Sequence, residues 1–209
     1  MNQLIWDFGT LDKDQEADYV KALLDQFSED NVFKRFSNES LSKTITSAQQ
    51  LVRTLTENIA SVSQRDFQRV FKLVSFFFNK KKEMYQLYKK TKTDFEVKKM
   101  NDNELINESV ILALAVVYYF RLPSNVTMNK KLGRRLSPRE AFEEFMDEQI
   151  CHSDSKFVDI LDHEMSFYLN QMKLPGSIAK NNALKENVFA IVVSVASKFV
   201  LLFIPFFFF

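Results

Sequence analysis

The amino-acid sequence predicts an all-α fold, and three observations lead to that prediction. The 209 residues include only 3 glycines and 4 prolines, which are too few turn-forming residues for a β-sandwich, a barrel or a doubly wound sheet. Apolar residues recur at the three- and four-residue spacing of amphipathic helices over most of the chain. Hydrophobic residues make up 46% of the sequence, enough to bury a core and to exclude an intrinsically disordered chain.

Charge and cysteine content narrow the class of protein. The chain has 28 Lys and Arg against 27 Asp and Glu. It therefore lacks the surplus of basic residues that would indicate a nucleic-acid partner. The single cysteine, Cys151, cannot form an internal disulfide. Asp7, Asp12 and Lys13 interrupt the first apolar residues, unlike a signal peptide. These features predict a cytoplasmic protein.

Three helices are expected in the first half of the chain, near residues 12–27, 38–60 and 64–90. The first helix carries acidic residues in its first turn, where the helix dipole favours them. Asn38 can cap the second helix, and Ser63 forms with Asp66 an aspartate version of the capping box before the third. The apolar stripe of the third helix is predicted to be buried; it contains Phe67, Val70, Phe71 and Val74.

Four helices are expected in the second half, near residues 104–120, 137–150, 155–173 and 181–198, with a loop at 121–133. The run 110–120 is apolar on every side, which predicts a buried central helix, and at about 11 residues it is too short to cross a bilayer. Ser137, Pro138 and Glu140 form the clearest helix start in the chain. The predicted buried residues in this half are Leu112, Val116, Phe142, Phe145 and Phe167.

The residues that could perform chemistry form no recognisable catalytic or metal-binding pattern. The only histidines, His152 and His163, do not combine with Cys151 into a metal-ligand spacing or a nucleophile pair that sequence can identify. The glycines are isolated, and no phosphate-binding loop is present. We therefore expect no metal site, no catalytic residue and no tight nucleotide binding by this chain alone.

Arg65 is the exception, because it places a cation in the first turn of a helix. The helix dipole disfavours a positive charge there by roughly 0.3 to 1 kcal/mol. Such a residue can mark an arginine aimed at an anion beyond the helix end. The alternative is an exposed arginine whose charge is offset by Asp66, and the residues alone favour this alternative.

The segment 61–70, SVSQRDFQRV, resembles the sensor segment of dynein-like AAA+ lids, which reads Ser-x-Arg-Asp-x-x-Arg at the head of a helix. Two other signatures, LIWDFG at 4–9 and LPGSIA followed by NALKENVF at 174–189, are similar in order to those of mysterin-like proteins. These proteins are giant RING-type E3 ubiquitin ligases with tandem AAA+ modules. The resemblance extends over residues 1 to 204.

The resemblance implies a domain organisation. Residues 1–100 correspond to a helical AAA+ lid subdomain, 101–175 to connecting helices that complete it, and 176–209 to a truncated start of the next α/β AAA+ module. Pro205 and four phenylalanines stand where the family has its next phosphate loop. Arg65 matches the sensor arginine that contacts the γ-phosphate of ATP held by the preceding module, whereas Arg69 is either a second anion contact or a surface residue.

The function implied is that of a non-autonomous fragment of an ATPase core, in which ATP hydrolysis is coupled to ubiquitin transfer by the full-length parent. ATP and magnesium would be bound in that parent only. The expected partners are neighbouring AAA+ modules of the parent chain and, through the parent, the ubiquitin machinery. Family behaviour also implies a cytoplasmic location with recruitment to lipid droplets.

A different class of function remains open, namely a tail-anchored helical membrane adaptor or interaction protein. Residues 188–209 form an apolar stretch, and about 20 residues suffice to span a bilayer. Lys198 lies within this stretch, where a lysine costs roughly 2.5 to 3.5 kcal/mol on insertion. The buried start of a further module explains the same hydrophobicity, and we prefer that interpretation.

Overall fold

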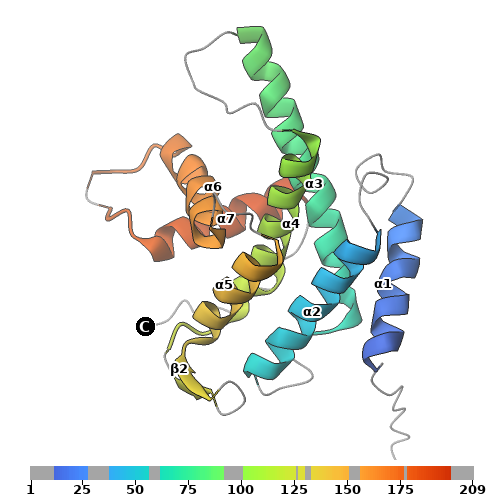
Figure 1. The fold of residues 1–209 in the computed structure, drawn as a ribbon. Helices are drawn as coiled ribbons and strands as arrows, with labels where there is room; N and C mark the ends of the chain where they lie inside the picture. The colour runs from blue at the N-terminus through green and yellow to red at the C-terminus, as the bar shows by residue number, and fades with distance from the viewer. Residues whose placement is uncertain are drawn as a thin grey trace, which may run out of the picture.

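The computed structural model describes residues 12–27, 38–56, 62–91, 101–125, 127–129, 133–150, 156–176 and 178–198. It confirms the predicted all-α class (Figure 1). The predicted helix ends agree with the structure to within about four residues where both are described. The helices are α1 (Lys13–Phe27), α2 (Asn38–Thr56), α3 (Gln64–Thr91), α4 (Asp102–Val117), α5 (Pro138–Gln149), α6 (Phe157–Gln171) and α7 (Asn182–Ala196), with a 3-10 turn, η3 (Tyr119–Arg121).

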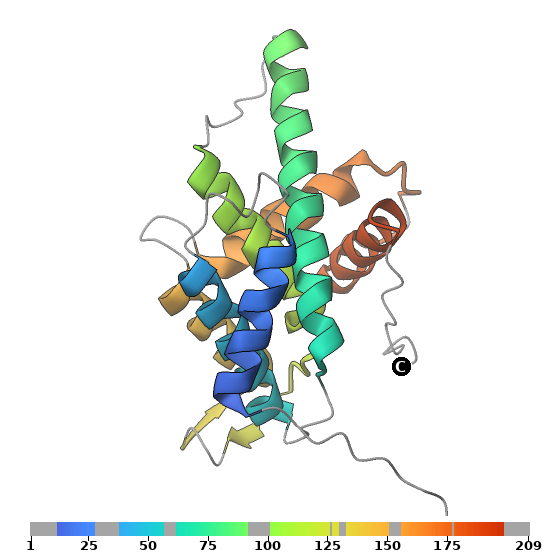
Figure 2. The same ribbon diagram turned by 90° about the vertical axis from the view of Figure 1, so that its right-hand side faces the viewer.

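The bundle is organised around the long helix α3 and the buried helix α4, which pack against each other. Helix α1 lies alongside α2 and α3 on one side, as Figure 2 shows, and α5 packs against α2 and α6. The far end of α3 extends beyond the bundle (Figures 1 and 2). The apolar stripe of α3 is buried as predicted, and so are Leu112, Val116 and Phe142, while Phe145 and Phe167 are half-buried.

Helix α4 is the centre of the core. Every residue from Ser109 to Val117 is buried, which confirms the prediction from its apolar run. Among the described helices, the stretch Asp102–Arg121 has the length and composition to cross a membrane, and 67% of its most apolar window is buried inside the protein. This burial is what the core helix of a helical bundle requires.

The prediction of a loop over 121–133 is wrong at residues 127–129. Two short strands, β1 (Thr127–Asn129) and β2 (Arg134–Leu136), pair antiparallel, with Thr127 opposite Leu136. Gly133 has φ +67°, a left-handed conformation that glycine adopts without steric cost, just before the second strand. Strands of three residues are too short to show an alternating pattern in the sequence.

Both local and long-range contacts determine where the later helices start. At α5 the Ser137 hydroxyl accepts a bond from the Glu140 N–H (3.1 Å) and Glu140 accepts one from the Ser137 N–H (2.7 Å), which confirms the predicted capping box. Helix α6 is different, because the Phe157 N–H donates to the Asp147 carboxylate of α5 (2.7 Å). The start of α6 is therefore satisfied by another helix.

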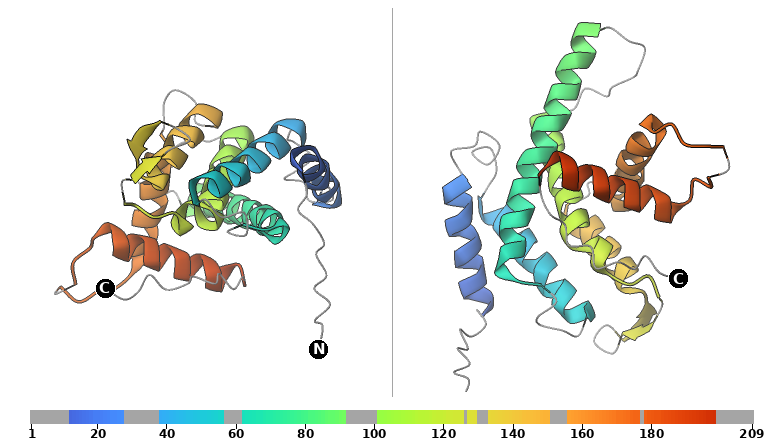
Figure 3. Two further views of the ribbon diagram at one scale, coloured as in Figure 1. Left: turned by 90° about the horizontal axis from the view of Figure 1, so that it is seen from below. Right: turned by 180° about the vertical axis from the view of Figure 1, so that it is seen from behind.

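Helix α7 lies across the bundle (Figure 3) and docks through the Phe189 ring. That ring lies 6.0 Å from the Phe77 ring of α3, 6.1 Å from Phe120 of η3 and 5.7 Å from Tyr168 of α6. The Arg139 guanidinium of α5 adds a two-bond ion pair to Glu186 (2.7 and 3.1 Å). Aromatic packing and a bidentate pair together attach α7 to the other helices.

The course of α7 bears on the tail-anchor alternative. Val188, Phe189 and Val193 are buried against the bundle, so these residues are not available to lipid. The helix ends at Ala196, and Lys198 adopts a left-handed conformation (φ 53°) that stops it. Residues 199–209, which hold the rest of the apolar stretch, lie outside the described residues, as do the segment 4–9, Cys151 and His152.

Candidate functional site

The candidate site is the N-terminal end of α3, where a buried carboxylate organises the first turn. The Ser63 N–H and hydroxyl donate to Asp66 Oδ2 at 2.8 and 3.4 Å, and the Asp66 N–H donates to the Ser63 carbonyl at 2.9 Å. The first of these bonds is the one expected from an acid at the third helical position. One half of the predicted capping box is thus confirmed, whereas the other half is absent because the Asp66 N–H is bound by the Ser63 carbonyl and not by its hydroxyl.

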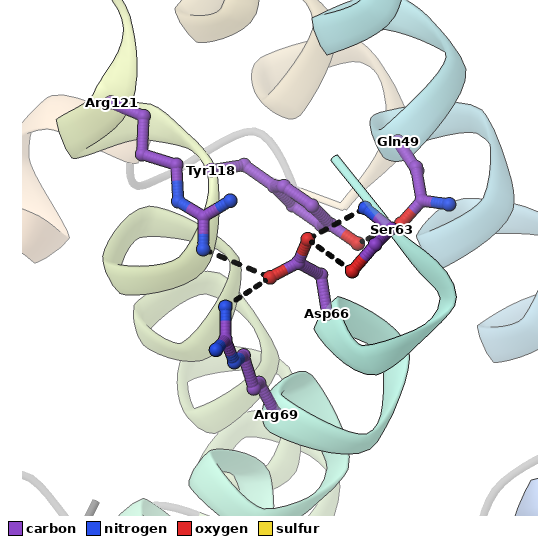
Figure 4. Close-up of polar contacts among 6 residues, drawn as sticks. All are labelled: Gln49, Ser63, Asp66, Arg69, Tyr118 and Arg121. Carbon is purple, nitrogen blue, oxygen red and sulfur yellow. Dashed lines mark hydrogen bonds and ion pairs between the residues drawn. The ribbon is translucent and has the colours of Figure 1, made fainter. Parts of the chain in front are cut away.

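Asp66 also accepts contacts from two arginines (Figure 4). Arg69 Nη1 lies 2.8 Å and Arg121 Nη2 2.9 Å from the same atom, Asp66 Oδ1. Arg69 comes from the next turn of α3, whereas Arg121 comes from η3 and lies 55 residues after Asp66 in the chain. The carboxylate thus joins the start of α3 to the end of the α4 and η3 segment.

The ionisation of Asp66 follows from these contacts. The carboxyl is 1% exposed, and burial alone would raise its pKa because it disfavours the charged form. The positive charge of Arg121 and the Ser63 N–H outweigh that effect, so the pKa of Asp66 is lowered from its ordinary value of 3.8. The group is a stable anion at neutral pH.

Arg65 lies beside this anion but does not pair with it. Its side chain is exposed in the first turn of α3, and it makes no ion pair with any residue in the described parts of the chain. The predicted accessibility of Arg65 is confirmed. Asp66 pairs with Arg69 and Arg121 and forms no ion pair with Arg65, and an exposed Arg65 agrees with both of the interpretations that the sequence left open.

A layer of polar side chains lies next to Asp66 and includes Tyr118 and Gln49 (Figure 4). The Gln49 amide satisfies its neighbours best when its nitrogen donates to Tyr118 Oη (2.9 Å) and its oxygen accepts from Arg53 (3.0 Å). The opposite orientation would set the amide nitrogen against the guanidinium and leave a long 3.4 Å contact to Glu16. Burial, followed by the Asp66 charge, raises the pKa of Tyr118 well above its ordinary value, so its hydroxyl stays neutral.

Arg53 and Glu16 complete the layer as an ion pair of 2.7 Å between α2 and α1. The Glu16 side chain is 2% exposed, and a buried carboxylate of this kind requires a paired cation. The layer therefore joins α1, α2 and Tyr118 at the end of α4, and the Gln49 amide nitrogen also reaches the Ser63 carbonyl (3.3 Å) just before α3.

Sequence reasoning singled out Arg65 and Asp66 but missed the role of Arg121, which it assigned to a loop. No local pattern marks this arginine, since its partner is distant in the sequence. Arg69, left open as an anion contact or a surface residue, proves to be an ion-pair partner of Asp66 with 26% exposure. His163 is exposed on α6, and the described residues contain no cluster of three His, Cys, Asp or Glu that could hold a metal.

Comparisons with known proteins support the family resemblance. The zebrafish (Danio rerio) E3 ubiquitin-protein ligase rnf213-beta is 23% identical over 195 residues, and the human (Homo sapiens) and mouse (Mus musculus) E3 ubiquitin-protein ligases RNF213 are 25% and 24% identical over 197 residues. Each alignment covers 93% of this chain. The chain resembles a segment of RNF213.

The chain spans about 4% of the length of these curated relatives. No family model matches the sequence, and no solved structure matches it. The resemblance to RNF213 therefore rests on sequence alignment over nearly the whole chain, and it covers a small part of a giant ubiquitin ligase.

Proposed function

We propose that this chain is a non-autonomous segment of the ATPase core of a mysterin-like E3 ubiquitin ligase, and that Arg65 contacts the γ-phosphate of ATP held by the preceding module. The observation that carries the proposal is the exposed position of Arg65 in the first turn of α3, beside an Asp66 carboxylate that is bound to other arginines. A cation at this end of a helix costs stability locally. An anion supplied from outside the chain would reverse that cost.

The proposed chemistry is electrostatic. A fixed guanidinium stabilises the charge that develops on a transferring phosphoryl group, and it acts best when it is held rigidly before the reaction. The Asp66 carboxylate supplies that rigidity by fixing the first turn of α3 to η3. The sequence contains no phosphate loop, so ATP and magnesium would be bound in the full-length parent and the chain alone would be inactive.

The same proposal assigns a domain organisation and partners to the chain. Residues 1–100 form the lid subdomain, 101–175 the connecting helices, and 176–209 the start of the next module. The partners are then neighbouring AAA+ modules and, through the parent, the ubiquitin machinery, with residence in the cytoplasm and at lipid droplets. The burial of Phe189 among rings of α3, η3 and α6 supports a fixed attachment of the third part to the first two.

ATP hydrolysis by the full-length protein that carries this segment tests the proposal. Arg65→Ala is expected to slow ATP turnover by the preceding module, which holds the nucleotide, by about 10- to 1,000-fold, as loss of a phosphoryl-directed group does. The matched control is Lys72→Ala, which removes another exposed cation of α3 and should leave turnover unchanged. Unchanged turnover after Arg65→Ala, in a module shown to hydrolyse ATP, would remove the proposed role.

Thermal unfolding of the chain itself gives a second measurement. Because Arg65 is exposed, Arg65→Ala should change its free energy of unfolding by no more than about 0.5 kcal/mol. A loss of several kcal/mol would show that Arg65 stabilises the fold and would contradict the assignment to an external anion.

A further inference from the structure

The segment 118–122, which contains η3, contacts four other helices, namely α2, α3, α5 and α7. Three residues per turn set successive side chains of a 3-10 turn about 120° apart, so neighbouring residues face different helices. The Arg121 guanidinium lies 2.9 Å from Asp66 of α3 (Figure 4). The Tyr118 hydroxyl lies 2.9 Å from the Gln49 amide of α2.

Helix α5 holds this segment through Arg139. The Arg139 Nε donates to the Leu122 carbonyl at 2.9 Å, and the guanidinium lies 5.0 Å from the centroid of the Tyr119 ring. The Tyr119 hydroxyl donates to Glu143, also on α5, at 2.6 Å. Arg139 thus contacts the first residue of η3 and the residue that follows its last.

The same arginine binds α7. Its two terminal nitrogens lie 2.7 and 3.1 Å from the two carboxylate oxygens of Glu186. A bidentate pair fixes the orientation of a guanidinium as well as its distance. Phe120 adds a direct contact between η3 and α7, because its ring lies 6.1 Å from the Phe189 ring. The position of α7 therefore constrains the guanidinium that holds η3.

A second ion pair of α7 has no such connection. Lys185, next to Glu186, lies 2.6 Å from Asp162 of α6. Within the described parts of the chain, neither Lys185 nor Asp162 forms a hydrogen bond or an ion pair with the segment 118–122. Of these two adjacent attachments of α7, the one made by Glu186 leads to η3.

We propose that η3 couples α7 to the start of α3: docked α7 holds η3 through Arg139, and η3 holds the first turn of α3 through Arg121. Asp66 receives the contact on α3, and its other carboxylate oxygen accepts from the Ser63 N–H at 2.8 Å. Chains of packed and hydrogen-bonded side chains carry energetic coupling between distant groups in this way. Arg139 is thus a positioning residue, and displacement of α7 would loosen the turn that carries Arg65.

This inference goes beyond the proposed function, because it concerns contacts within the chain and holds whether or not Arg65 meets a nucleotide. ATP turnover of the parent with Arg65→Ala tests the proposed function separately. Neither result decides the other.

NMR of the whole chain tests the coupling, with Glu186→Gln as the variant. The substitution removes the charge that holds Arg139 to α7 and leaves every residue of η3 and α3 unchanged. The Ser63 N–H and Arg121 Nε–H signals should shift. The Ser63 amide should also exchange with solvent about 5-fold faster or more, relative to the buried amides of α4, which is the lower end of typical couplings between sites.

Lys185→Gln is the matched control, since it removes the neighbouring ion pair of the same helix. It should leave the Ser63 and Arg121 signals in place. Signals that stay unmoved in Glu186→Gln, or that move as far in Lys185→Gln, would overturn the inference. Normalising to α4 removes any effect of a general loss of stability, because buried core amides exchange only in the larger opening events.

The coupling should also act in the reverse direction, because coupling between two sites is reciprocal. Asp66→Asn at the start of α3 should speed the amide exchange of residues 187–193 in α7, relative to α4, by about 5-fold or more. Asp18→Asn, which changes an exposed acid of α1, should not. If α7 exchange only follows that of α4 in Asp66→Asn, the inference fails, and this measurement decides the matter even if Glu186→Gln does not fold.

Discussion

Replacing Asp66 with asparagine should destabilise the fold strongly, although the two side chains have almost the same shape. The substitution removes the charge that faces Arg69 at 2.8 Å and Arg121 at 2.9 Å. Hydrogen bonds to charged groups contribute about 1.5 to 3 kcal/mol each. The arginine side chains are 26% and 32% exposed, so water recovers part of that loss, and we expect a net cost of about 2 to 4 kcal/mol.

The pH dependence of this cost has a definite sign. The pKa of Asp66 in the folded chain lies below its ordinary value of 3.8, so the carboxylate stabilises the fold above pH 3.8. This contribution is lost as the pH falls through the lower folded-state pKa. The difference between Asp66→Asn and the unmodified chain should therefore be full at pH 7 and should fade below about pH 3.8.

Urea unfolding followed by far-ultraviolet circular dichroism measures both effects. With a urea dependence of about 1 to 3 kcal/mol per molar, the midpoint at pH 7 should fall by about 1 M or more. The control is Asp18→Asn, which neutralises an exposed acid of α1 and should cost less than about 0.5 kcal/mol. An unchanged midpoint for Asp66→Asn, or a difference that persists undiminished at pH 3, would refute the assignment of Asp66 as a charged anchor.

Three further predictions concern stability. Lys81 joins Glu108 (2.8 Å) and Glu164 (3.0 Å), which lie on α4 and α6, so Lys81→Met should cost about 3 kcal/mol in urea unfolding because two acids then face each other without a cation. Phe189→Ala empties a fully buried position; it should cost about 3 to 5 kcal/mol and raise the amide hydrogen exchange of α7. Ser137→Ala removes the cap of α5 and should cost about 1 kcal/mol in thermal unfolding.

Matched substitutions show what would contradict these three expectations. Lys72→Met and Ile191→Ala change exposed residues of the same helices, and each should cost less than about 0.5 kcal/mol. A Lys81 or Phe189 variant as stable as its matched control would remove the proposed contribution of that residue. A Ser137→Ala chain that melts at the unmodified temperature would show that the α5 cap contributes nothing.

The helices were predictable because their signals are local. The capping box of Ser137 and Glu140 involves residues three positions apart, and the structure reproduces it. The prediction for α4 started two residues late, at 104, although the sequence held the signal. Asn101 and Glu104 form a second capping box, the same pattern with asparagine as its first residue.

The candidate site was predictable only in part. Arg65 and Asp66 stand together at a helix start, so the sequence showed an unusual cation and a capping acid. The pairing of Asp66 with Arg121 was not predictable, since Arg121 lies 55 residues away at the end of an apolar run. Asp147, which caps α6 from α5, escaped prediction for the same reason.

The sequence by itself determined where helices form, which of their faces are buried, and that Arg65 is exposed. It also carries the resemblance to RNF213. These properties depend on residues within about four positions of one another, or on aligned sequence, and both can be read along the chain. The tertiary structure alone decided that Asp66 pairs with Arg121, that β1 pairs with β2, and that α7 lies against the bundle. Ion pairs and ring contacts between distant segments exist only after the helices have packed, because packing determines which side chains come within bonding distance.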